Sequence, residues 1–122
     1  MKKFLLILWL VLVLPIHIFG QNIFRPIKAT IYDSQGQFSS TNFNCPNMKV
    51  YDKGSHVLAY WGGETIKLYR DKNDANFYSD SQTKYGTTIK IAAYRSSNTR
   101  KIYLVIVSTI SNSQRTDINF KP

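Results

Sequence analysis

A recurring pairing of lysine with tyrosine is the feature of this sequence best suited to bind a ligand. An apolar residue, a Lys and a Tyr recur together five times, and in each unit the Lys and Tyr are an even number of residues apart. In an extended strand this spacing puts both side chains on one face, opposite the aliphatic residues. The candidate ligand-binding residues are Lys28, Lys49, Tyr51, Lys67, Tyr69, Lys90 and Tyr94, with Trp61 as a further aromatic at a strand end.

Two interpretations of this Lys and Tyr face stay open. Ammonium groups attract phosphate, sulfate or carboxylate, and tyrosine rings stack on sugars or bases, so the face would suit an anionic glycan, a lipid headgroup or an acidic protein. Lys and Tyr also suit the solvated face of an ordinary antiparallel sheet, where they stabilise one another without a ligand. Trp61 likewise either faces a ligand or caps a core.

Side chains suited to catalysis are scarce. Beyond residue 20 the chain has one His, His56, one Glu, Glu64, and one Cys, Cys45. These residues cannot build a His-based metal site or an internal disulfide. Cys45 and His56 could form a nucleophile and base, but no acid stands at a recognisable spacing to orient the His, so a buried thiol or an intermolecular bridge suits Cys45 better. The run 71–76 lacks the Gly and the oxygen ligand that a calcium loop needs. We predict no enzymatic activity, no metal and no cofactor.

The first twenty residues have the pattern of an export signal. Lys2 and Lys3 precede an apolar run, Pro15 interrupts it, and Gly20 supplies a small residue before Gln21. The alternative is an uncleaved membrane anchor, for which the apolar run is shorter than the roughly 20 residues that span a bilayer. We predict a signal peptide over 1–20 and a secreted or periplasmic domain over 21–122. Loss of the two lysines would lower the formal net charge from +9 to +7, which favours solubility or an anionic partner.

Short β-prone runs divided by turn signals fill the rest of the chain, with little helical periodicity. Strands are expected over 27–33, 48–52, 57–61 and 64–70, a weak edge strand over 38–45, a poorer strand over 77–85, and a polar tail from about residue 111 that is either a last edge strand or loose. The predicted fold is a single all-β domain, a small antiparallel β-sandwich or barrel of about seven to eight strands.

The hairpin over 87–110 is predicted to be the centre of that fold. Its second run, IYLVIV over 102–107, is apolar at every position, which predicts an innermost strand covered on both faces. The polar loop 96–99 between the two runs contains Asn98, a residue able to adopt a left-handed turn conformation.

The order of several features resembles the small exported lysozyme-inhibitor barrels of the MliC type. The features are Phe43-Asn44-Cys45, the β-run near Val50, the segment GETIKL over 63–68 and the segment ANFYSD over 75–80. The resemblance implies inhibition of lysozyme or another hydrolase through a loop that carries Tyr78 and Ser79. The main expectation is an exported, non-enzymatic binding domain; a hydrolase inhibitor and a structural envelope component are the alternatives.

Overall fold

A computed structural model describes residues 21–122 as nine β-strands joined by turns and loops, with no helix in that range. The strands are β1 (Gln21–Asp33), β2 (Gly36–Ser40), β3 (Met48–Asp52), β4 (His56–Trp61), β5 (Glu64–Arg70), β6 (Phe77–Lys84), β7 (Thr87–Arg95), β8 (Ile102–Ser111) and β9 (Gln114–Lys121). The predicted signal peptide lies outside the described residues. Within them, no helix is long and apolar enough to cross a bilayer.

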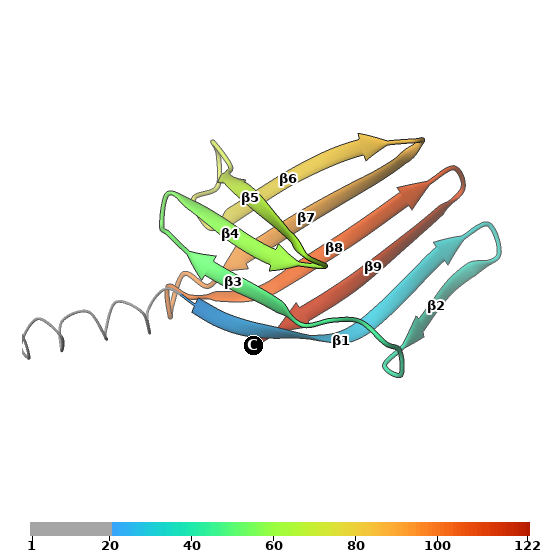
Figure 1. Ribbon diagram of the computed structural model, residues 1–122, viewed down its shortest axis with the longest axis horizontal. Helices are drawn as coiled ribbons and strands as arrows, with labels where there is room; N and C mark the ends of the chain where they lie inside the picture. The colour runs from blue at the N-terminus through green and yellow to red at the C-terminus, as the bar shows by residue number, and fades with distance from the viewer. Residues whose placement is uncertain (1–20) are drawn as a thin grey trace, which may run out of the picture.

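The nine strands form a closed, antiparallel, eight-stranded barrel with one extra strand. Consecutive strands from β3 to β9 pair with one another, and β9 pairs with β1 to close the barrel. The two ends of β1 have different neighbours along one edge: its first residues pair with β3, and its last residues pair with β2. β2 is therefore the extra strand, beyond the end of β3 (Figure 1). Of the two architectures predicted, the barrel is confirmed.

The core fills one half of the barrel. Eight strands leave an interior just wide enough for side chains to fill, and alternate residues of the strands point into it. The buried cluster consists of Phe24, Met48, Val50, Val57, Ala59, Leu68, Tyr78, Ile91, Ala93, Ile102, Val105, Val107 and Phe120.

The expectation of an innermost strand covered on both faces is wrong. In β8, Val105 and Val107 are buried, whereas Leu104 and Ile106 are only half-buried and Tyr103 is 47% exposed. Every strand of a barrel has one inner and one outer face, so from Leu104 to Val107 the apolar residues alternate between the outer surface and the core.

Two further expectations are corrected at the ends of β8. The residue with the left-handed backbone before β8 is Arg100, with a φ of 62°, and not Asn98. The polar tail is neither loose nor an edge strand, because β9 lies between β8 and β1 and buries Phe120 completely. The segment has a weak β propensity of its own, and its pairing with β1, which is distant in the sequence, stabilises it as a strand.

The strands differ in length, and this difference opens one end of the barrel. β4 ends and β5 begins at the Gly62–Gly63 turn, where both glycines have positive φ. β5 pairs with β6 only through Tyr69 with Ser79 and Arg70 with Tyr78. The hairpin of β6 and β7 and that of β8 and β9 continue past this turn (Figure 1). We call the resulting opening, between the start of β5 and the far half of β6, the mouth.

Candidate ligand site at the barrel mouth

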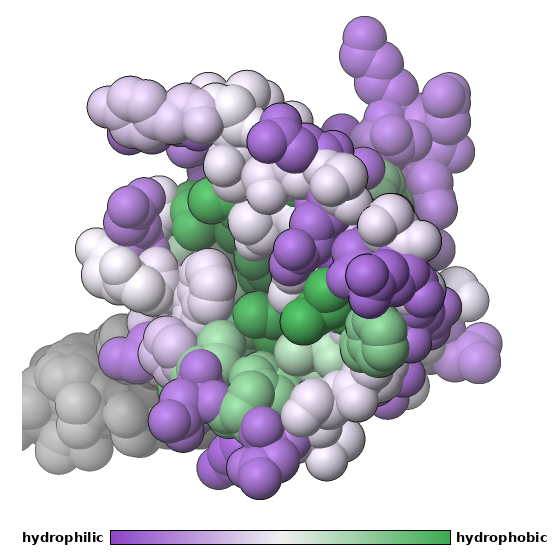
Figure 2. All heavy atoms as spheres, turned by 90° about the vertical axis from the view of Figure 1, so that its right-hand side faces the viewer, coloured by the Kyte–Doolittle hydropathy of each residue, from purple (hydrophilic) through white to green (hydrophobic). Residues whose placement is uncertain are grey.

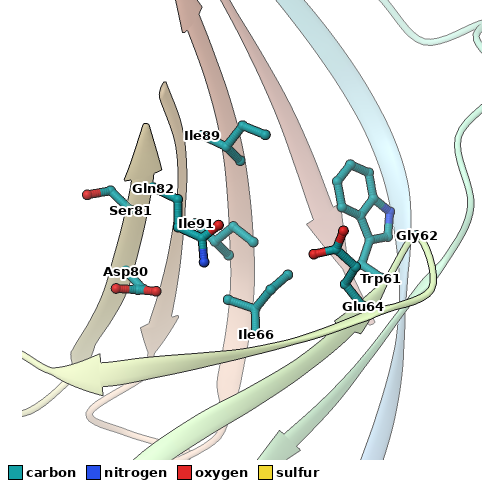
Figure 3. A pocket seen from close by; sticks show the side chains of 9 residues that line it. All are labelled: Trp61, Gly62, Glu64, Ile66, Asp80, Ser81, Gln82, Ile89 and Ile91. Carbon is teal, nitrogen blue, oxygen red and sulfur yellow. The ribbon is translucent and has the colours of Figure 1, made fainter. Parts of the chain in front are cut away.

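A hollow of about 170 Å³ lies in the mouth. The end of β4, the turn after it, β5, β6 and β7 supply its walls, and Figure 3 shows the side chains around it. It is lined by Trp61, Gly62, Glu64, Ile66, Asp80, Ser81, Gln82, Ile89 and Ile91.

The floor of the hollow is apolar and continuous with the core. Ile91 of β7 is 3% exposed, and Ile66 of β5 packs against the core cluster. Ile89, two residues before Ile91, points to the same inner face but is 43% exposed. The inner face of the barrel thus carries an aliphatic side chain that the short β5 does not cover.

More uncovered apolar groups lie across the mouth on β1 and β2. Ile31 pairs with Phe38 in the register of these strands, and the two are 36% and 54% exposed. Alternation along β1 from Ala29, which pairs with the core-packed Ile118, places Ile31 on the inner face. Figure 2 views this end of the molecule: hydrophobic atoms gather at its centre and hydrophilic ones surround them.

Trp61 is held at the wall of the hollow by two contacts. Its ring meets the ring of Phe120 edge to face, with centroids 5.8 Å apart. Its Nε1 donates a hydrogen bond to the carbonyl of Pro46 at 3.0 Å. Trp61 therefore packs on the core and also lines the site, so the two alternatives considered for it are compatible.

Three polar side chains stand at the rim of the hollow. Glu64 projects from the β5 side and Gln82 from the β6 side, toward the space between them (Figure 3). Asp80 pairs with Ile91 and so belongs to the inner face. Within residues 22–122 neither carboxylate forms a salt bridge. The arrangement can hold a small apolar body on the isoleucines and Trp61 while the rim hydrogen-bonds a polar group.

The seven predicted Lys and Tyr residues all lie on the outer face, but the barrel separates them. Lys49 and Tyr51 on β3 are near Lys67 and Tyr69 on β5, because β4 pairs with both strands. The other three lie elsewhere on the circumference, on β1 and β7; they are Lys28, Lys90 and Tyr94.

The residues on β3 to β5 form a convex Lys and Tyr patch, consisting of Lys49, Tyr51, Tyr60, Lys67 and Tyr69. Tyr51 and Tyr60 meet edge to face at 5.0 Å, and Lys67 Nζ lies 5.4 Å from the ring centroid of Tyr69. Lys49, Tyr51 and Tyr60 also line a shallow outer groove of about 560 Å³ beside the Gly62–Gly63 turn.

Cys45 and His56 are not brought together. Cys45 makes a side-chain hydrogen bond with Trp61, which is the last residue of β4. His56 is the first residue of β4, and its Nδ1 shares a hydrogen bond with Ser55 Oγ at 3.0 Å. The length of β4 separates them by about 16 Å. Burial raises the pKa of the Cys45 thiol above its ordinary value, and the contact with Trp61 lowers it by less.

The calcium-like loop and the two residues implied by the inhibitor resemblance also have structural roles. In the loop 71–76, Asp71 accepts a hydrogen bond from the backbone of Asn73 and Asp74 accepts one from that of Asn76, both at 2.9 Å. The described residues contain no group of three or more His, Cys, Asp or Glu that could hold a metal ion. Tyr78 and Ser79 lie in β6, with Tyr78 only 1% exposed, so they do not stand on the exposed loop that the resemblance implies.

Comparison with known proteins gave no match among protein-family models, curated proteins or solved structures. The candidate site therefore depends on its geometry alone. Trp61 is the one residue of the hollow that was a candidate from the sequence. The others, Glu64 and Ile89 among them, were missed, because the sequence shows Ile89 only as a core-facing residue. The unequal lengths of the predicted strands were the available signal, since 48–61 is built from shorter β-runs than 87–110.

Proposed function

We propose that this chain is an exported binding protein without enzymatic activity, which holds a small apolar ligand in the mouth of its barrel. The main support for the proposal is the exposure of Ile89. This inward-facing side chain is 43% exposed, although Ile91 on the same face is 3% exposed. Fully burying an aliphatic side chain of this size contributes about 1.5–3 kcal/mol. A ligand seated on Ile89 gains part of that free energy without any change of fold.

The size of the hollow limits the ligand. A dry cavity of roughly 150 Å³ is known to take a benzene molecule, and the hollow measures about 170 Å³. The ligand is therefore an aromatic ring or a short acyl chain, with its polar end toward Glu64 and Gln82. Barrel mouths are a frequent place for such sites.

Trp61 gives a direct readout of this binding. It is the only Trp beyond residue 20, and it lines the hollow. Titration of the processed protein with the neutral single-ring probe benzyl alcohol should change Trp61 fluorescence saturably. Absence of saturation would contradict the proposal.

A matched pair of variants separates the mouth from general surface hydrophobicity. Ile110 of β8 is 38% exposed, close to Ile89, but its pairing with Thr88 places it on the outer face. Ile89→Asn should weaken probe binding by at least about tenfold, the equivalent of 1.4 kcal/mol, whereas Ile110→Asn should leave it unchanged. Equal effects of the two changes would rule out the mouth as the site.

The Lys and Tyr patch supports a second candidate function, the binding of an anionic glycan, a lipid headgroup or an acidic protein. The observation that favours it is the shallow groove shared by Lys49, Tyr51 and Tyr60. Lys49→Gln with Lys67→Gln should reduce retention on immobilised heparin more than Lys90→Gln with Lys28→Gln, a control with the same change in charge at other places on the barrel. Equal losses would indicate a non-specific effect of net charge.

A further inference from the structure

A second hollow, of about 300 Å³, lies at the end of β4 opposite the mouth. Three arginines from separate parts of the chain meet there: Arg70 at the end of β5, Arg95 at the end of β7, and Arg100 in the loop before β8. Its remaining lining contains no acidic residue and consists of Gly54, Ala75, Asn76, Tyr78 and Ser97.

Arg95 forms the fixed base of this arginine hollow. Its guanidinium donates to both carboxylate oxygens of Asp52, at 2.6 and 2.7 Å. It also donates to the Tyr78 hydroxyl at 2.7 Å and to the carbonyl of Arg100 at 3.0 Å. Four hydrogen bonds hold the Arg95 side chain, which is 13% exposed, and Asp52 compensates its charge.

The other two arginines are not compensated in this way. Arg70 donates a hydrogen bond to the carbonyl of Gly54 at 2.6 Å, and its guanidinium carbon lies 6.0 Å from the Tyr78 ring centroid. Neither Arg70 nor Arg100 forms a salt bridge within residues 22–122. Three guanidinium groups thus meet at a single hollow, and only that of Arg95 is paired with a carboxylate.

The backbone conformation of Arg100 does not itself require an Arg side chain. Its φ of 62° lies in the left-handed region, which Gly and Asn adopt with less strain than Arg. The turn itself uses only main-chain groups of this residue, since the amide of Arg100 donates to the Ser96 carbonyl at 2.8 Å. Residues with this backbone occur in tight turns and also cluster at functional sites; in the other hairpin turns Tyr85 and Asn112 share it.

We propose that the arginine hollow binds an oxyanion group, a carboxylate, sulfate or phosphate, between Arg70 and Arg100. Planar guanidinium groups match these anions with paired N–H donors. The side chains of Asn76 and Ser97 at the wall offer further donors. This site is separate from the mouth and does not depend on the function proposed there.

The test is an NMR titration of the arginine Nε–Hε signals with sodium phosphate, sulfate and acetate in turn, at constant ionic strength. The signals of Arg70 and Arg100 should shift saturably with at least one anion, and the anion that binds most tightly identifies the group. If no anion gives saturation at these signals, the proposal is wrong.

Arg100→Gly distinguishes a binding role from a structural one. It should lower anion affinity at least tenfold and leave the melting temperature equal or higher, because Gly relieves the left-handed strain. Arg25→Gln, on the exposed part of β1, removes the same charge and should leave affinity nearly unchanged. Retained affinity in Arg100→Gly, or an equal loss in Arg25→Gln, would overturn the proposal.

Discussion

Ile89 and Ile91 are successive inward-facing residues of β7, yet one is 43% exposed and the other 3% exposed. The pairing of β5 with β6 stops at Ser79, which lies beside Ala92 of β7, and the two strands diverge from the level of Ile91 onward. Ile91 forms the floor of the hollow between them, and Ile89 lies further toward its opening. The same inner face therefore serves as core in one half of the barrel and as a candidate binding surface in the other.

The two faces of β8 should respond differently to charge. Val105→Asp places a carboxylate at a position with no exposure and should cost more than about 3 kcal/mol of unfolding free energy, because the charge must be desolvated or protonated. Ile106→Asp, on the half-buried outer face, should cost about 1 kcal/mol. Urea unfolding of both variants measures the difference, and equal losses would show that the outer face is covered.

Phe120 should contribute strongly to stability although it lies near the end of the chain. It is fully buried and contacts Trp61, so Phe120→Ala should cost about 3–5 kcal/mol and change Trp61 fluorescence. Phe38→Ala, at a 54% exposed position, should cost less than about 1 kcal/mol. Thermal unfolding of the pair tests whether β9 closes the barrel; a small effect at Phe120 would mean that it does not.

The Asp52 and Arg95 pair should matter more than the surface pair of Arg115 and Asp117. Asp52→Asn removes the charge that accepts two bonds from Arg95, and we expect a loss of about 2 kcal/mol. Arg115 is 47% exposed, so Arg115→Gln should cost less than about 1 kcal/mol. Comparable losses in urea unfolding would contradict a structural role for the inner pair.

Cys45 should be a slow nucleophile in the folded protein. Burial raises the pKa of its thiol, so the folded state holds the proton to higher pH and less thiolate is present near pH 8. Alkylation by iodoacetamide at pH 8 should be slower in buffer than in urea. The unfolded chain loses the thiol proton at a lower pH than the folded protein does. The free energy of unfolding should therefore fall as the pH rises from the ordinary thiol pKa toward the raised one, and it should fall less in Cys45→Ser. Faster alkylation of the folded protein would instead indicate an activated thiol.

Local patterns were enough to predict much of the fold. The strands predicted over 48–52 and 64–70 coincide with β3 and β5. Closure was not predictable, because it depends on the pairing of β1 with β9, two segments at opposite ends of the domain. A polar run such as Gln114–Lys121 becomes a strand only when both neighbours are in place.

The candidate site was less accessible from the sequence. Period-2 spacing correctly placed Lys49 and Tyr51 together on one face, but it contains no information about curvature, which moves Lys28 and Lys90 to other sides of the barrel. Ile89 has the sequence signature of a core residue. Its exposure follows from where β5 begins and how its first residues diverge from β6, a relationship between strands that neither strand encodes alone.

A small apolar ligand in the mouth can be observed directly by NMR. The isoleucine methyl groups are labelled with ¹³C, and intermolecular NOEs to bound benzyl alcohol, a single-ring probe, are recorded. We expect NOEs from the probe to the methyl groups of Ile66, Ile89 and Ile91, which line the hollow, and none to Ile110 on the outer face. NOEs to Ile110 in place of these, or a bound probe without contacts to Ile89, would contradict it.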